Sequence, residues 1–113
     1  MEISAASDGV EVISRAYARR HGIARTDDWL MLKLTEEVGE LTQAYLRLSG
    51  QSRPHDGDAR AALGAEIADS LAQLLVLARR FDIDIEAELE RKWFSWRDVV
   101  DPVDCLGIAA GVP

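Results

Sequence analysis

The sequence predicts an all-α fold built from four helices. Only three prolines interrupt its 113 residues, so long segments are free to form helix. Apolar residues recur at intervals of three and four, which is the period of an amphipathic helix, and no segment shows the alternation of a strand. A chain of this length forms one domain. We expect that domain over residues 1–100, followed by a tail over 101–113 that is disordered or packed on a partner.

The first two helices are predicted from stop and start signals. The first helix is expected from about residue 8 to residue 21, because Val10, Ile13 and Tyr17 share a face and Gly22 favours a C-terminal stop. Thr26 is a suitable N-cap for a second helix over residues 27–49. The second helix carries an apolar stripe at helical spacing: Leu30, Leu34, Val38, Leu41, Tyr45 and Leu48.

A loop rich in glycine and proline, residues 50–58, separates the second helix from the third. Asp58 can cap a third helix over residues 59–80, and Asp84 can cap a fourth over residues 85–97. The third helix has its own apolar stripe: Leu63, Ile67, Leu71, Leu74, Leu75 and Ala78. The residues after Pro102 have no helical period.

The overall composition disfavours several classes of function. Acidic residues outnumber basic ones by 20 to 13, and the net charge of −7 argues against a nucleic-acid polymer or an anionic membrane as partner. Cys105 is the only cysteine, which excludes an internal disulfide and a cysteine-based zinc site. The first residues lack the pattern of a signal peptide, and no apolar run approaches the ~18 residues of a membrane span. We therefore expect a cytoplasmic protein with no membrane partner.

Two acidic motifs on neighbouring predicted helices point to a metal site. The second helix contains EEVGE at residues 36–40, and the third contains EIAD at residues 66–69. Successive residues are about 100° apart around a helix, and at this spacing each motif lies beside its apolar stripe, displaced in the same rotational direction in both helices. Two antiparallel helices that face each other bring both motifs to one side of the pair, and the short loop favours antiparallel packing. We therefore expect four carboxylates to converge: Glu37, Glu40, Glu66 and Asp69.

Four converging carboxylates need a counter-charge. Two unit charges about 4 Å apart repel by about 4 kcal/mol at an effective dielectric constant of about 20. A site made only of oxygen ligands suits Mg²⁺ or Mn²⁺. The alternative is a set of ordinary solvated charges, since glutamate is a common helix former. A di-iron carboxylate bundle is disfavoured, because it needs Glu-x-x-His motifs and the only histidines, His21 and His55, lie at a helix end and in a loop.

The segments KLTEEVGELTQA and EIADSLAQLLVLA resemble the MazG-like all-α nucleoside triphosphate pyrophosphohydrolases. The signature of that family, Glu-Glu-x-x-Glu followed by Glu-x-x-Asp, is matched at residues 36–40 and 66–69, and the resemblance covers residues 29–92. It implies a four-helix subunit that forms a helical bundle with a partner, as a homodimer or homotetramer. It also implies Mg²⁺-dependent hydrolysis of nucleoside triphosphates between the α and β phosphates, giving a monophosphate and pyrophosphate.

The resemblance assigns roles to the acidic residues. It implies that Glu37, Glu40, Glu66 and Asp69 are the metal ligands, which are the four residues that the helix geometry also selects. It implies that Glu36 orients or deprotonates the attacking water, so that Glu36 and Glu37 are the catalytic pair. The role it implies for such an enzyme is the removal of aberrant or surplus nucleotides.

Three further residues are candidates for binding the substrate. Lys92 stands where the family often has a lysine for the triphosphate, although Ser95 and Trp96 replace the asparagine that follows a turn later. Lys33 lies one turn before Glu37 and is a second candidate for the phosphates, or a simple partner of that glutamate. Trp29 lies on the same flank as the acidic residues and offers a surface on which a base can stack.

Two alternative functions remain open at this point. The first is an enzyme like phosphoribosyl-ATP pyrophosphohydrolase, which shares the acidic pattern. Its usual pair of an aromatic residue and a histidine is absent after Asp69, where the sequence reads SLAQ. The second is a non-catalytic helical assembly module in which the acidic residues only aid solubility.

Overall fold

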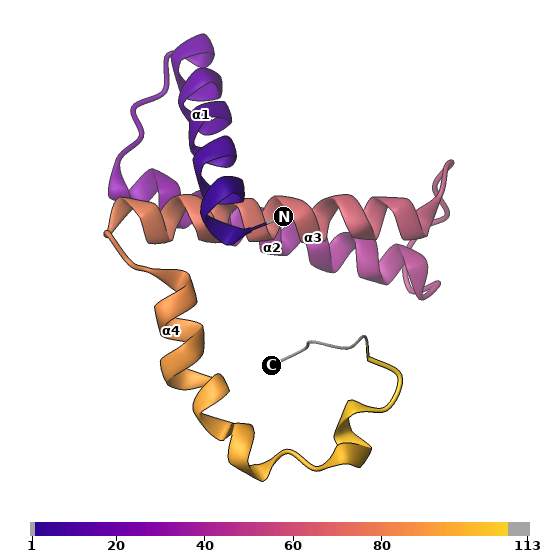
Figure 1. The fold of residues 1–113 in the computed structure, drawn as a ribbon. Helices are drawn as coiled ribbons and strands as arrows, with labels where there is room; N and C mark the ends of the chain where they lie inside the picture. The colour runs from indigo at the N-terminus through magenta and orange to yellow at the C-terminus, as the bar shows by residue number, and fades with distance from the viewer. Residues whose placement is uncertain (1, 109–113) are drawn as a thin grey trace.

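The structure is a computed structural model that describes residues 2–108, and its regular secondary structure is helical throughout this range (Figure 1). Four α-helices are followed by two short 3-10 helices: α1 (Ile3–His21), α2 (Asp27–Leu48), α3 (Ala59–Arg80), α4 (Ile85–Lys92), η1 (Phe94–Val99) and η2 (Pro102–Cys105). No strand occurs among the described residues, so the predicted all-α class is confirmed. Residues 109–113 of the predicted tail lie outside the described range.

The predicted caps delimit the helices. Thr26, Asp58 and Asp84 each accept a hydrogen bond from a backbone amide in the first turn of α2, α3 and α4. Gly22 ends α1 in the left-handed region at φ 64°, where a residue without a Cβ atom meets no steric penalty. Local sequence chemistry is therefore sufficient to fix where these helices begin or end.

The start of α1 differs from the prediction. The helix begins at Ile3 rather than near residue 8, and Asp8 lies within it as a partner of α3. Its Oδ1 atom lies 2.6 Å from Nη1 of Arg79 at the end of α3, and the same nitrogen donates a hydrogen bond to the Ser7 hydroxyl. This contact holds an additional turn of α1 against α3.

The end of α4 also differs from the prediction. The helix stops at Lys92 rather than at residue 97, and the chain tightens into the 3-10 helix η1. The Arg97 guanidinium forms two hydrogen bonds with the Glu90 carboxylate, at 2.6 and 3.0 Å, and lies 4.9 Å from the centre of the Phe94 ring. These contacts fold η1 back onto α4.

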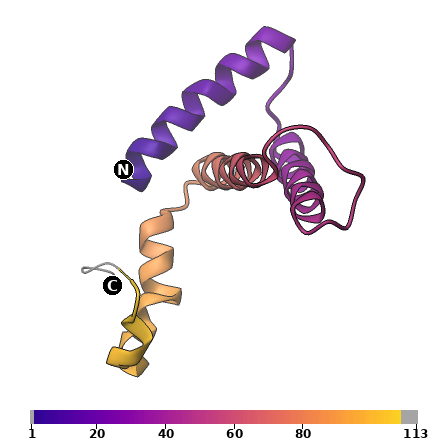
Figure 2. The same ribbon diagram turned by 90° about the vertical axis from the view of Figure 1, so that its right-hand side faces the viewer.

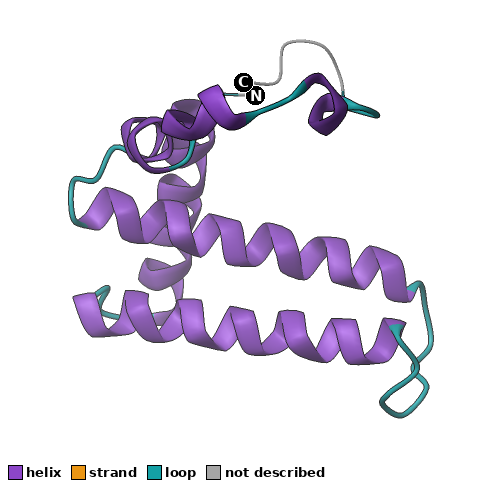
Figure 3. Cartoon of the chain, turned by 90° about the horizontal axis from the view of Figure 1, so that it is seen from below, coloured by secondary structure: helices purple, strands orange, loops and turns teal. Residues whose placement is uncertain are grey.

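The central feature of the fold is the antiparallel pair formed by α2 and α3. The two helices lie side by side along their length and are joined at one end by the loop over residues 49–58 (Figure 3). α1 packs on α3 from one side of this pair, and α4 leaves the end of α3 on the other side (Figures 1 and 2). α4 and η1 contact each other but have little contact with the pair itself.

The buried core of a single chain is small. Leu30 and Val76 are the largest fully buried side chains, and the other buried apolar residues are mainly alanines: Ala18, Ala44, Leu75 and Ala78. Small residues let the helices approach closely, but they bury little apolar surface. Much of the apolar stripe predicted on α2 and α3 stays about half exposed, including Val38, Tyr45, Ile67, Leu71 and Leu74.

Charged contacts fix α1 and the following loop to the helix pair. The buried Glu11 carboxylate binds Arg25 through two hydrogen bonds, at 2.6 and 3.2 Å, and Arg15 through one at 2.7 Å. Arg80, at the end of α3, donates to the Arg25 carbonyl oxygen at 2.7 Å and pairs with Asp27 at 2.7 Å. The start of α2, the loop before it and the end of α3 are therefore linked through Arg80.

The expectation that no segment is apolar enough for a membrane span is corrected at α3, the one described helix that is long and apolar enough to cross a membrane by length and composition. The central helix of a bundle has the same composition, and α3 packs along α2 for its whole length. Its two acidic residues, Glu66 and Asp69, lie in the middle of the helix, where a lipid environment would be costly for them. These observations favour the role of a bundle helix.

We predict that Glu11→Gln lowers the free energy of unfolding by about 2–3 kcal/mol at neutral pH, because Arg25 would lose its charged partner in a buried setting. Hydrogen bonds from Arg25 hold the pKa of Glu11 below its ordinary value of 4.5. The ion pair therefore stabilises the folded state fully at pH values above 4.5, and this stabilisation is lost as the pH falls through the lower pKa of Glu11 in the folded state.

Urea denaturation of both proteins at neutral and at acidic pH tests this prediction. The stability difference should shrink in acid, because protonation of Glu11 then removes the same charge from the wild type. Glu86→Gln, at an exposed position in α4, is the control and should change stability little. A stability difference that is independent of pH would contradict the assigned role of the ion pair.

Candidate metal centre

Four carboxylates converge between α2 and α3. Glu37 and Glu40 come from α2, Glu66 and Asp69 come from α3, and each contributes an oxygen atom such that all four lie within 4.8 Å of one another. The antiparallel pairing sets the Glu-x-x-Glu motif of one helix beside the Glu-x-x-Asp motif of the other. The convergence predicted from the sequence is therefore present in the structure.

Part of the cluster lies deeper than the helix geometry indicated. The helical spacing of about 100° per residue placed the motifs beside the apolar stripes, at the edge of the helix contact. The side chain of Glu37 is nevertheless only 12% exposed. The Oε2 atoms of Glu37 and Glu66 are buried and have no hydrogen-bond partner among the described residues. Asp69 on α3 is exposed, so the cluster extends from the interior of the helix pair to its surface.

The electrostatics of the cluster are unfavourable without a cation. Burial raises the pKa of Glu37, and the nearby charges of Glu40 and Asp69 raise it further, against the opposing effect of Lys33. Burial likewise raises the pKa of Glu66, again with contributions from Glu40 and Asp69. A bound divalent cation would satisfy the partnerless oxygens and neutralise the repulsion. The residues present therefore fit a hard cation such as Mg²⁺ or Mn²⁺.

Glu36 is separated from the other acidic residues. Its side chain is 54% exposed, and its Oε1 atom accepts a hydrogen bond from Nζ of Lys33 at 2.6 Å. This hydrogen bond raises the pKa of Lys33. The same Nζ lies 3.9 Å from Oε1 of Glu37, so Lys33 bridges the outer glutamate and the cluster.

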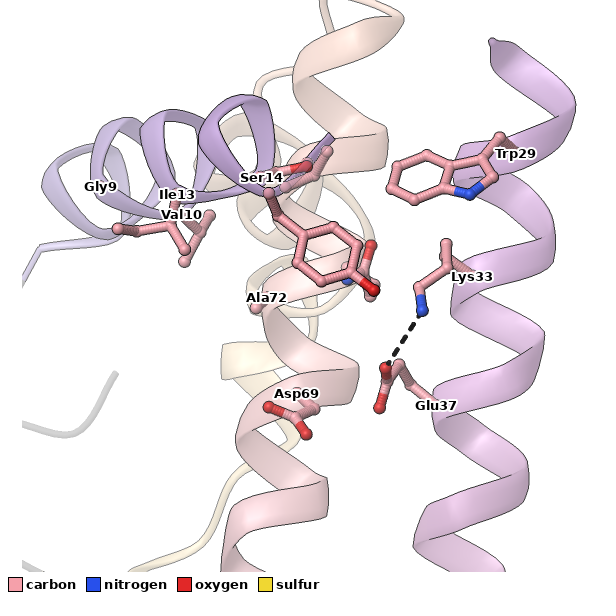
Figure 4. Close-up of a pocket in the computed structure, with 12 residues that line it drawn as sticks. Gly9, Val10, Ile13, Ser14, Trp29, Lys33, Glu37, Asp69 and Ala72 are labelled. Atoms are coloured by element: carbon pink, nitrogen blue, oxygen red, sulfur yellow. Dashed lines mark ion pairs between the residues drawn. The ribbon is translucent and has the colours of Figure 1, made fainter. Parts of the chain in front are cut away.

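An aromatic cavity of about 390 Å³ opens beside the cluster, between α1, α2 and α3 (Figure 4). Trp29, Lys33, Glu37 and Asp69 are all part of its wall, so the structure brings two of the predicted substrate-binding residues together with two of the predicted ligands. The lining also includes Gly9, Val10, Ile13, Ser14, Tyr17, Ala72, Gln73 and Val76.

Two residues of this aromatic cavity were missed in the sequence analysis as site residues. The ring centres of Tyr17 and Trp29 each lie 6.0 Å from Nζ of Lys33, so two aromatic rings surround one cation. The Oε1 atom of Gln73 is buried and has no hydrogen-bond partner in the described part of the chain. Tyr17 was identified only as part of an apolar helix face, and its position beside Trp29 depends on how α1 packs.

The remaining candidate, Lys92, lies at the last position of α4. α4 leaves the helix pair on the side opposite α1 and has little contact with it (Figure 1). Within one chain, therefore, Lys92 does not join the acidic cluster.

No protein-family model, curated protein or solved structure matches this chain. The resemblance to MazG-like enzymes accordingly rests on the five acidic residues and their apolar surroundings.

We predict that Mg²⁺ or Mn²⁺ raises the melting temperature of the wild-type protein. A cation at about 100 times its dissociation constant stabilises the native state by about 2.7 kcal/mol, which corresponds to about 10 °C in a domain of this size. Glu40→Gln should melt no lower than wild type in EDTA, because it relieves repulsion, and should gain much less from the cation.

The matched control is Glu36→Gln, which removes a neighbouring carboxylate that lies outside the cluster. This variant should keep the wild-type response to the cation. Thermal denaturation with and without each metal measures the shifts, and equal shifts for wild type and Glu40→Gln would exclude a shared metal site.

Proposed function

We propose that this chain is a Mg²⁺-dependent nucleoside triphosphate pyrophosphohydrolase that cleaves between the α and β phosphates. The observation that carries the proposal is the convergence of four carboxylates, two with buried and partnerless oxygens, at the edge of an aromatic cavity. The cavity volume of about 390 Å³ is in the range of small-molecule sites. Mn²⁺ takes the same oxygen ligands and is the expected substitute.

Each group of acidic residues has its own role in the proposed reaction. Glu37, Glu40, Glu66 and Asp69 would hold the cation, which when bound supplies neutralisation of phosphate charge and a site for the attacking water. Glu36 would orient that water or accept its proton, as the family resemblance implies. The hydrogen bond with Lys33 holds Glu36 near Glu37, while the Glu36 carboxylate stays outside the cluster of four.

The aromatic cavity suits the nucleoside part of such a substrate. Trp29 and Tyr17 offer ring surfaces for a base, and base–aromatic stacking contributes about 1–3 kcal/mol per base. The unpaired Gln73 oxygen is an acceptor for a base or sugar donor. Lys33 supplies a positive charge between the rings and the metal cluster. We propose that the enzyme removes aberrant or surplus nucleotides in the cytoplasm.

An enzyme like phosphoribosyl-ATP pyrophosphohydrolase is the nearest alternative, because it would use the same four carboxylates. The residues after Asp69 read SLAQ, without the aromatic residue and histidine usual in that enzyme, and Gln73 of this segment lines the cavity instead. This difference favours a nucleoside triphosphate pyrophosphohydrolase. The large exposed apolar surface supports a helical assembly module instead, although assembly and catalysis are compatible in one protein.

The exposed surface of one chain supports a homo-oligomer. The chain exposes 8768 Å², whereas a compact monomer of 12.5 kDa exposes about 6,200 Å². Its radius of gyration is 17.3 Å, compared with about 13 Å for a compact domain of this length. The excess of about 2,600 Å² per chain is enough for an obligate dimer interface, which buries about 2,000–5,000 Å² in total.

We infer that a second copy of this chain covers the apolar side of the α2 and α3 pair, in a homodimer or homotetramer. Met31, Leu71, Leu74, Phe81 and Ile83 line a hollow of about 830 Å³ on this side, with almost no polar surface. α4 forms one boundary of this hollow. It extends away from the α2 and α3 pair and is therefore free to contact a partner (Figure 2).

We predict that the purified protein releases pyrophosphate and a nucleoside monophosphate from one or more nucleoside triphosphates when Mg²⁺ or Mn²⁺ is present. Replacing any cluster carboxylate should reduce this turnover by at least about a hundredfold, the usual effect of losing a group that stabilises the transition state. Chromatographic product analysis measures the outcome. Release of orthophosphate and a diphosphate, or no turnover of any nucleotide, would contradict the assignment.

We further predict a mass of two or four chains by sedimentation at micromolar concentration. Leu71→Glu places a charge on the apolar side of the pair, where the native residue is 55% exposed, and should shift the protein toward the monomer. Leu32→Glu is the matched control, because Leu32 is 66% exposed but is not one of the residues that line the hollow on that side. A monomeric wild type, or equal effects of both changes, would refute this interface.

A further inference from the structure

A second hollow adjoins the acidic cluster on the side away from Trp29. Its volume is about 670 Å³, and its wall includes Glu40 and Glu66 of the cluster. Three basic residues from the end of α2 and the following loop complete the wall: Arg47, Arg53 and His55. We call this feature the basic hollow. Its basic residues stand out in a chain whose net charge is −7.

The acidic cluster separates the basic hollow from the aromatic cavity. Glu37 and Asp69 face the aromatic cavity, whereas Glu40 and Glu66 face the basic hollow. Along α2, Trp29 lies about 12 Å before Glu37, and Arg47 lies about 10 Å after Glu40, at a rise of 1.5 Å per residue. The aromatic cavity, the acidic cluster and the basic hollow therefore follow one another along α2.

The charges of the basic hollow are free to bind an anion. Arg47, Arg53 and His55 form no ion pair within residues 2–108. Nη2 of Arg47 donates a hydrogen bond to the Asp56 carbonyl oxygen at 2.7 Å, which holds the loop against α2. His55 Nδ1 lies 2.8 Å from the Arg53 carbonyl oxygen, so these two loop residues are also held together. The loop therefore presents the Arg53 guanidinium and the His55 ring beside the cluster.

We propose that the basic hollow binds the β and γ phosphates of the substrate, which leave as pyrophosphate. This inference rests on the proposed function and adds the direction in which the substrate lies: the nucleoside in the aromatic cavity, the α phosphate at the cluster and the leaving group at the loop. Water adds to the α phosphorus and the bond to the α–β bridging oxygen breaks. That oxygen leaves with the pyrophosphate, and the water proton passes to a carboxylate or to solvent.

The opposite orientation fits the charges less well. It would place up to three negative charges of the polyphosphate between Trp29 and Tyr17, with Lys33 as the only cation of that cavity, and leave the basic hollow to a neutral base. Arginine binds phosphate oxygens through paired hydrogen bonds, which strengthen as negative charge develops on a leaving group. The distribution of aromatic and basic residues therefore selects one direction.

Binding of inorganic tripolyphosphate and of pyrophosphate in the presence of Mg²⁺ tests the proposal, with calorimetry as the measurement. The double variant Arg53→Gln, His55→Gln should bind both anions at least about tenfold more weakly, a change of about 1.4 kcal/mol, and should bind a nucleoside monophosphate as wild type does. Arg60→Gln is the control, since it removes an exposed charge near the same loop but outside the basic hollow. Both altered residues are exposed, so the fold should survive, and the melting temperature verifies it.

The outcomes separate this proposal from the proposed function. Binding of tripolyphosphate that depends on Arg53 and His55, without turnover of any nucleotide, would support the anion site and refute the enzyme. Nucleotide hydrolysis with unchanged kcat and KM in the double variant would refute the anion site and leave the enzyme intact. Equal tripolyphosphate affinity in wild type and double variant, or no binding by a wild type that binds Mg²⁺, would also overturn the proposal.

Discussion

The antiparallel contact between α2 and α3 is the constraint on which the rest of the structure depends. It brings two pairs of carboxylates from opposite helices to within 4.8 Å of one another. It also creates the groove that holds the aromatic cavity at one end of the cluster and the basic hollow at the other. A helix pair with a different register would separate Glu37 and Glu40 from Glu66 and Asp69, and neither hollow would adjoin an acidic cluster.

This contact combines an unfavourable electrostatic arrangement with a small core. The helices approach through small residues such as Ala44 and Ser70, and the space between them is partly filled by carboxylates that burial makes harder to ionise. Charges placed where apolar side chains would otherwise pack reduce stability, which is a common feature of functional sites. The ion pairs of Glu11 and Arg80 lie at the end of the pair away from the loop over residues 49–58, where they attach α1 and the loop before α2.

The same shortage of core explains the large exposed apolar surface. Leu71 and Leu74 follow the helical period of a buried face, yet each is about half exposed in one chain. α4 and η1 extend from the pair and do not cover this face (Figure 1). An apolar face of this size is costly in water. The hollow on the apolar face shares no lining residue with the aromatic cavity or the basic hollow, so a partner seated in it would not have to cover the acidic cluster.

The sequence by itself determined the class of the fold, the caps Thr26, Asp58 and Asp84, and the convergence of the four carboxylates. These features depend on local chemistry and on the helical period, which a sequence contains in full. The tertiary structure alone decided that α1 places Tyr17 beside Trp29, that Glu36 turns outward to Lys33, and that α4 carries Lys92 away from the cluster. Such relations depend on packing angles and on the path of loops, which are set by contacts between residues distant in the chain and therefore have no local pattern in the sequence.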